Sequence, residues 1–201
     1  MRNIFTLAMA VVLAAGVAFT QDKGKGGPPP GGGAAAKGKG GPGLTLTTTA
    51  FQDGGIIPDQ YTQQVPNAVS PALTWSNVPA GTQSFVLHLH DPDVALNKNT
   101  SDVIHWIVWN IPATATGLPE NVPAVATSPD GMIQGNNQGG MPGFRGPGAP
   151  ATGPPHHYTF ELFALDTKLD LPPTATRDDV IKAINGHING KAVLVGRFIR
   201  H

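Results

Sequence analysis

The chain has 201 residues, of which 13 are basic and 13 are acidic, and it contains no cysteine. The balanced charge gives no electrostatic reason to expect a nucleic-acid partner, and the missing cysteines exclude a disulfide framework and an N-terminal lipid-modified cysteine. Near the start, Arg2 precedes an apolar run over residues 4–19. This run is short for a membrane span and typical of a secretory signal peptide. We therefore predict a signal peptide over residues 1–20, a secreted or periplasmic protein, and no transmembrane span in the mature chain; an uncleaved anchor is the alternative.

Residues 21–43 consist almost entirely of Gly, Pro, Ala and Lys. Such a composition cannot bury apolar surface, so we predict a disordered Gly/Pro/Lys-rich linker. Its lysines leave open a weak attraction to an anionic envelope, beside the simpler interpretation of a solvated tether. Residues 44–201 remain, which is enough for one domain with a core of its own.

Strand patterns dominate this part of the chain. In residues 84–90, Phe85, Leu87 and Leu89 alternate with Val86, His88 and His90, and residues 104–111 are almost continuously apolar. The alternation predicts a strand with two different faces, and the continuous run predicts a strand buried on both faces. The full set of predicted strands is 44–49, 72–75, 84–90, 104–111, 158–165 and 192–199.

One helix is predicted near the C-terminus. Thr176 can cap it, Asp178 and Asp179 suit its first turn, Ile181, Ile184 and Ile188 form an apolar stripe, and Gly190 is placed at its end. Many strands, few helices and frequent proline predict a mainly β fold. We expect an antiparallel β-sandwich with a few short peripheral helices.

Polar residues gather at the ends of three predicted strands. Asp91-Pro92-Asp93 follows one strand, His105-Trp106 begins the next, and His156-His157-Tyr158 begins a third behind the Gly/Pro-rich segment 135–155. Such groups are costly to bury without a polar partner, so they indicate a binding site. His156 and Tyr158 should point to one side of an extended chain, with His157 on the other. We expect His105, His156 and Tyr158 to donate to a small anion, with Asp91 orienting His105; a plain β-turn at 91–93 is the simpler alternative.

Enzyme chemistry is less well supported by the sequence. There is no G-x-S-x-G elbow, cysteine nucleophile, phosphate loop or dinucleotide fingerprint, so we expect no catalysis, no metal and no cofactor. His88 and His90 nevertheless form an H-x-H pair that can hold a transition metal. A metal-dependent hydrolase that uses His88, His90 and Asp91 therefore stays open as an alternative.

Read in order, these motifs resemble the phosphatidylethanolamine-binding protein family, in its bacterial Raf-kinase-inhibitor-like (YbhB/YbcL-type) branch. The likeness covers residues 44–201 and is carried by D-P-D at 91–93, H-W at 105–106, G-F-R-G-P at 143–147 and H-H-Y at 156–158. It implies a β-sandwich with a small anion pocket near one end. The pocket residues it implies are Asp91, His105, Gly148, His156 and Tyr158, supported by Asp93 and Trp106.

The sequence thus predicts an exported binding protein for phosphate-like groups or phospholipid head groups, which could modulate another protein. The resemblance leaves inhibition of a secreted protease as an alternative, because some family members inhibit kinases or proteases. A passive envelope-associated protein is a further alternative and depends only on the basic linker.

Overall fold

The computed structural model describes residues 43–201, so the predicted signal peptide and all of the predicted linker except Gly43 lie outside the described residues. Within this part, the chain forms short strands, four long strands, two 3-10 turns and one α-helix. In order they are β1 (Thr45–Thr47), β2 (Gly55–Ile56), a 3-10 turn (Asp59–Tyr61), β3 (Leu73–Ser76), β4 (Ser84–Asp91), a 3-10 turn (Leu96–Lys98), β5 (Val103–Pro112), β6 (Gly117–Leu118), β7 (Ile133–Gln134), β8 (His156–Leu165), α1 (Arg177–Ala183) and β9 (Ile188–Phe198).

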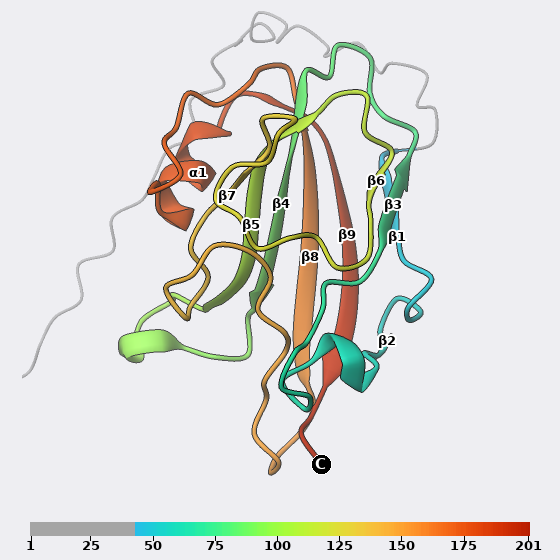
Figure 1. Ribbon diagram of the computed structural model, residues 1–201, viewed down its shortest axis with the longest axis vertical. Helices are drawn as coiled ribbons and strands as arrows, with labels where there is room; N and C mark the ends of the chain where they lie inside the picture. The colour runs from blue at the N-terminus through green and yellow to red at the C-terminus, as the bar shows by residue number, and fades with distance from the viewer. Residues whose placement is uncertain (1–42) are drawn as a thin grey trace, which may run out of the picture. The chain divides into compact units, whose positions relative to one another are not determined.

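The strands form two sheets. The larger has six strands in the order β2-β9-β8-β4-β5-β7, and the smaller has three in the order β1-β3-β6. Only the short pairing of β2 with β9 is parallel among the described strands. Figure 1 shows β1, β3 and β6 on one side of the long strands and α1 on the other. The predicted antiparallel β-sandwich with few helices is confirmed.

Each face of the six-stranded sheet has its own apolar core, because side chains alternate along a strand. The inner face carries Phe85, Leu87 and Leu89 of β4 and packs against side chains of the three-stranded sheet such as Trp75. The outer face carries Val86 of β4 with Trp109, Phe163, Val180 and Ile184, and is covered by α1. The two predicted faces of residues 84–90 are confirmed, and so is the burial of 104–111 on both faces.

The predicted helix is too long at its C-terminal end. Thr176 does cap it, and Asp179 completes a capping box, but α1 ends at Ala183 with Ile184 as the C-cap. Gly186 has φ of +85°, which turns the chain into β9 four residues before Gly190, the expected end. Ile188 consequently opens β9 instead of extending the helical stripe, and the buried helix residue is Val180.

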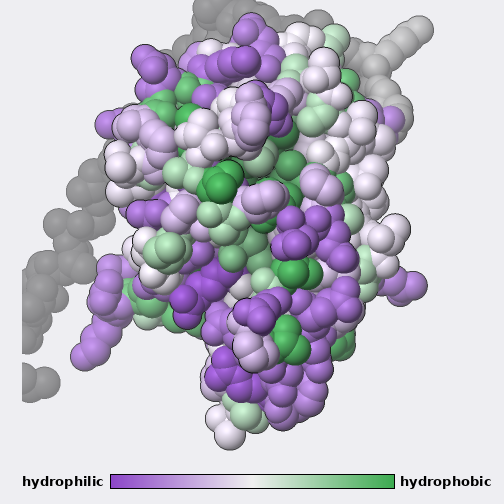
Figure 2. Space-filling view, viewed as in Figure 1, coloured by the Kyte–Doolittle hydropathy of each residue, from purple (hydrophilic) through white to green (hydrophobic). Residues whose placement is uncertain are grey.

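The surface is mixed in character. Figure 2 shows apolar residues on one face as separate spots among polar ones. Among residues 43–201, no helix combines the length and the apolar character needed to cross a membrane.

Candidate functional site

Strand pairing brings together four polar side chains that are distant in sequence: Asp91, His105, His156 and Tyr158, here called the Asp91 cluster. β4 runs antiparallel to both of its neighbours, β5 and β8. The end of β4, where Asp91 lies, is therefore beside the first residues of β5 and β8, which supply His105, His156 and Tyr158. Burying a carboxylate there requires partners, and the cluster provides them.

Asp91 is the buried centre of this cluster. Its side chain is only 4% exposed, and Oδ2 accepts a hydrogen bond at 2.8 Å from Nδ1 of His156. The other oxygen, Oδ1, accepts from the backbone N–H of Asp93 at 3.0 Å. The Asp91 carboxylate therefore has two roles: one oxygen stabilises the turn at 91–93, and the other holds His156. The prediction that Asp91 orients His105 is wrong in this detail, because the imidazole bonded to Asp91 is that of His156.

His105 is held by the backbone of the Gly/Pro-rich segment instead. Opposite the Leu89–His90 step of β4, β5 contains one extra residue, His105. This bulge turns His105 and Trp106 to the same face: His105 lies edge-on to Tyr158 at 5.1 Å between ring centroids, and Trp106 belongs to the inner core. Nδ1 of His105 lies 2.9 Å from the carbonyl oxygen of Arg145 and must donate to it, which leaves a lone pair on Nε2 of the neutral ring. Burial lowers the pKa of His105, which favours the neutral ring; in that form Nε2 is an acceptor, whereas the sequence predicted a donor.

Tyr158 lies at the bottom of the cluster and is fully buried. Its hydroxyl accepts a hydrogen bond at 3.1 Å from the backbone N–H of Gly148. Burial, and then the nearby charge of Asp91, raise the pKa of Tyr158 above its usual value. The phenol therefore stays protonated, and it can still donate its own hydrogen.

Segment 135–155 forms one side of the site, and Trp106 anchors it. The Trp106 indole N–H donates to Oε1 of Gln134 at 2.8 Å, and its ring packs edge-on against Phe144 at 5.7 Å. Further along, Gly148 lies beneath Gln63: a Cβ at position 148 would lie 2.5 Å from Nε2 of that side chain. The glycine thus lets Gln63, whose Nε2 also donates to the carbonyl oxygen of Gly146, cover the segment.

Asp93 and His157 form a separate exposed pair. Oδ2 of Asp93 accepts from the backbone N–H of His157 at 2.6 Å and lies 3.0 Å from its Nδ1, and the two side chains are 39% and 51% exposed. His157 lies on the side of β8 opposite to His156, as predicted. These hydrogen bonds lower the pKa of Asp93 despite its partial burial. Asp93 therefore supports the site by tying the turn at 91–93 to the start of β8.

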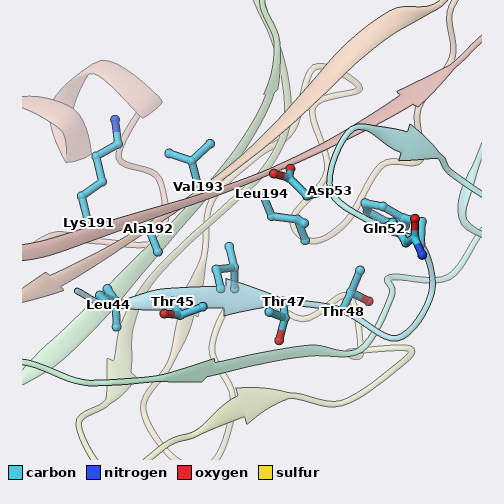
Figure 3. A pocket seen from close by; sticks show the side chains of 12 residues that line it. Leu44, Thr45, Thr47, Thr48, Gln52, Asp53, Lys191, Ala192, Val193 and Leu194 are labelled. Atoms are coloured by element: carbon cyan, nitrogen blue, oxygen red, sulfur yellow. The ribbon is translucent and has the colours of Figure 1, made fainter. Parts of the chain in front are cut away.

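His156 is the most open member of the Asp91 cluster, with 17% of its side chain exposed. Residues 63–69 and the Gly/Pro-rich segment line a surface hollow of about 720 Å³, to which Phe144, Arg145 and Gly146 contribute together with Gln63; no residue of the Asp91 cluster lines it. A second hollow of about 630 Å³, shown in Figure 3, lies between β1 and β9 and is lined by none of the predicted site residues. The accessible edge of the Asp91 cluster is thus the His156 ring.

The hydrolase alternative had combined residues from opposite faces of the sheet. His88 and His90 lie on the outer face, whereas Asp91 lies on the inner face with His156. The residue that joins the two histidines is Glu161 of β8, which pairs with His88 in register. Glu161 was not among the predicted site residues; it is the only charged residue in the strand pattern 158–165, and that is the signal that marks it.

Two other groups that contact the site could not be predicted from the sequence. The carbonyl oxygen of Arg145 and the side chain of Gln63 contact the site because of where their segments lie in space. No local pattern in the sequence marks either of them.

The fold and the site together define a β-sandwich with a buried carboxylate–imidazole–phenol cluster at one end of its larger sheet. The family model for phosphatidylethanolamine-binding proteins matches residues 47–199. The chain therefore belongs to the phosphatidylethanolamine-binding protein family, as the resemblance in the sequence indicated.

Relatives place it in the YbcL-type branch. It is 45% identical over 157 residues to a UPF0098 protein of Methanothermobacter thermautotrophicus, covering 78% of this chain and 99% of the relative. The crystal structure of Escherichia coli YbcL, described as a member of the mammalian family, matches with a TM-score of 0.69 and 30% identity over 80% of this chain and all of that one. A protein of Mycobacterium tuberculosis named as the lipoprotein LppC is 39% identical over 155 residues, covering 77% of this chain and 72% of the relative.

Proposed function

We propose that this protein is an exported binding protein that takes a small anion, a phosphate-like group or a phospholipid head group, at the Asp91 cluster. The observation that carries the proposal is the Asp91–His156 pair: a carboxylate 4% exposed holds, at 2.8 Å, an imidazole whose ring reaches the surface. With Nδ1 engaged by Asp91, the outward contact of His156 is made through Nε2. Once protonated there, the ring donates a charge-assisted hydrogen bond to an anion.

The remaining groups favour a ligand that offers both acceptors and a donor. The hydroxyl of Tyr158 accepts from Gly148 and keeps its own hydrogen to donate, while the Nδ1–H of His105 is used by Arg145, so a neutral His105 ring offers Nε2 as an acceptor. A monoprotonated phosphate, or the ammonium and phosphate of a phosphoethanolamine head group, supplies both kinds of partner. This complementarity supports the proposed ligand class.

We also propose that the protein binds its ligand without catalysing a reaction. Burial raises the pKa of Tyr158, so this hydroxyl is a poor base and a poor nucleophile. Export is proposed from the apolar run at 4–19, and the name of the mycobacterial lipoprotein LppC supports it by analogy. The 201 residues contain no cysteine, so they have no attachment site for the lipid that such a name implies.

The test uses two adjacent histidines on opposite sides of β8. Full-length protein, as wild type, His156→Gln and His157→Gln, is titrated with inorganic phosphate and separately with O-phosphorylethanolamine while amide chemical shifts are followed by NMR. We expect saturable shifts of the amides of Gly146, Gly148 and Tyr158 in the wild type and in His157→Gln, because His157 points away from the cluster. In His156→Gln these shifts should be lost.

The two titrants separate a bare anion site from a head-group site, since tighter binding of O-phosphorylethanolamine would indicate that its ammonium is recognised. Equal shifts in all three proteins would contradict the proposal. Shifts that vanish only in His157→Gln would move the site to the exposed pair.

A further inference from the structure

A second polar cluster lies on the outer face of the six-stranded sheet and does not take part in the proposed anion site. It consists of His88 and His90 of β4 with Glu161 of β8, here called the His88 cluster. β4 and β8 are paired so that His88 lies opposite Glu161. Because side chains two apart share a face of a strand, His90 joins them there.

The distances within this cluster match the ligand spacing of a metal ion. Oε2 of Glu161 lies 3.3 Å from Nδ1 of His88 and 3.6 Å from Nε2 of His90. Two ligands of a tetrahedral ion with bonds of about 2.0–2.1 Å lie roughly 3.3–3.4 Å apart. The imidazole rings are stacked in parallel, with centroids 4.4 Å apart and planes 3° from parallel, so both present ring edges to the same carboxylate.

The side chains around the proposed ligands are arranged like the groups that orient the ligands in known metal sites. Nδ1 of His90 lies 2.5 Å from Oδ2 of Asp102 and donates to it, which leaves the lone pair on Nε2 toward Glu161. Arg177, the first residue of α1, pairs with the other oxygen of Asp102. A carboxylate behind a ligating imidazole fixes its tautomer and raises its basicity.

Lys191 holds the carboxylate of Glu161 in place. Its ammonium pairs with Oε1, so Oε2 is left to face the histidines. Figure 3 shows Lys191 leaving β9 on the side opposite to Ala192 and Leu194, which agrees with its contact on the outer face. The ligating carboxylate is thus itself anchored, as expected for a built metal site.

Polar atoms of the two histidines are left without partners. The Nε2 atom of His90, which faces Glu161, is buried and has no hydrogen-bond partner within the described part of the chain. The Nε2 atom of His88 is also unpartnered, but it is not the atom that faces Glu161. Unpaired buried polar atoms are rare and call for an explanation.

We propose that His88, His90 and Glu161 bind a first-row transition metal of the Zn²⁺ type, through Nδ1 of His88, Nε2 of His90 and Oε2 of Glu161. Two imidazoles and one carboxylate are a ligand set that zinc accepts with an open fourth position. A cavity of about 410 Å³, lined by His88, Glu161, Arg177 and Lys191 among others, lies beside the cluster.

The local charges suggest what fills the fourth position. Glu161, Asp102 and Asp178 carry three negative charges, against the two positive charges of Arg177 and Lys191. A divalent ion would leave this group positive, so an anion such as hydroxide or a carboxylate is the favoured fourth ligand. The same two cations keep the affinity lower than in a site with acidic surroundings.

The proposal is tested by adding ZnCl₂ to full-length protein purified without a histidine tag, in phosphate-free buffer, with calorimetry as the readout. Wild type should bind one equivalent. His90→Gln and Glu161→Gln should lose binding, and Asp102→Asn should bind about 10–100-fold more weakly, since it removes only the group behind His90. His157→Gln and His187→Gln are matched controls, because both residues are exposed and lie outside the cluster, and they should bind like wild type.

A second measurement needs no variant. Cu²⁺ added at substoichiometric levels to the wild type should broaden amide signals of residues 88–90, 161 and 177 before those of 156–158. Absence of zinc binding in the wild type, unchanged binding in His90→Gln, or loss of binding in His156→Gln with early broadening at 156–158 would each overturn the proposal.

Discussion

The two faces of the six-stranded sheet each carry a carboxylate–imidazole cluster, and the two clusters are held in different ways. On the inner face, the partners of Asp91 and His105 include backbone groups of Asp93 and Arg145. On the outer face, Asp102 and Glu161 are held by the charged side chains of Arg177 and Lys191. Backbone partners cannot be removed by substitution, whereas side-chain partners can.

The two faces should therefore respond independently to mutation. His90 and Asp91 are adjacent in sequence but serve opposite faces, because successive side chains of a strand point to opposite sides. Changes in segment 135–155 should affect the inner cluster. Changes in α1 and β9 should affect the outer cluster.

The largest effect is expected from Asp91→Ala. This change leaves the His156 Nδ1–H and the backbone N–H of Asp93 without their acceptor in a buried position. We expect a loss of about 3 kcal/mol in the free energy of unfolding, measured by urea denaturation. Zinc binding at the outer face should be unchanged in the folded variant.

Asp93→Ala is the matched control for this prediction. Its exposed pair with His157 should contribute less than about 1 kcal/mol. A loss as large as that in Asp91→Ala would mean that the turn at 91–93, and not the buried carboxylate, supplies the stability.

An intermediate effect is expected when Glu161, on the outer face, is protonated at low pH and the free energy of unfolding falls. Hydrogen bonding from His88 and then the contact with Lys191 lower the pKa of Glu161 to about 2, against a usual 4.5, despite partial burial. A carboxyl with a depressed pKa in the folded state contributes stability that is present above pH 4.5 and lost as the pH falls toward 2. Glu161→Gln should lose less unfolding free energy than wild type between pH 5 and pH 2, as measured by denaturation at a series of pH values.

His88 affects stability at higher pH and should be separable. Burial lowers its pKa below 6.5, so stability falls as the pH drops below 6.5 and the unfolded chain takes up the proton. If wild type and Glu161→Gln decline in parallel below pH 5, then Glu161 does not carry the expected charge interaction.

The smallest effect is expected from Thr176→Ala. The Thr176 hydroxyl accepts from the backbone N–H of Asp179 at 3.2 Å and caps α1. Its loss should cost about 1 kcal/mol and speed amide exchange in α1. Because Arg177 begins that helix, zinc binding should weaken while the phosphate response of the Gly146 and Gly148 amides stays as in wild type. A change in both would show that the faces are coupled.

Much of this architecture could be predicted from local patterns. Alternation along 84–90 predicted the two faces of β4, and the threonine–aspartate pattern predicted the start of α1. The end of α1 was misplaced because the ability of Gly186 to adopt a positive φ outweighs the apolar spacing that seemed to continue to Ile188. A short helix that packs on a sheet ends where the chain must turn back toward the sheet. The spacing of apolar residues does not show where that turn lies.

The alternation of side chains, the residues at the strand ends and the family of the chain can all be predicted from the amino-acid sequence. The pairings became visible only in the folded chain: Asp91 with His156, His105 with the carbonyl oxygen of Arg145, and His88 with Glu161. The physical reason is that spacing within a strand sets which face a side chain takes. The register between strands and the course of long loops set which groups meet there, and both arise from contacts between residues far apart in the chain.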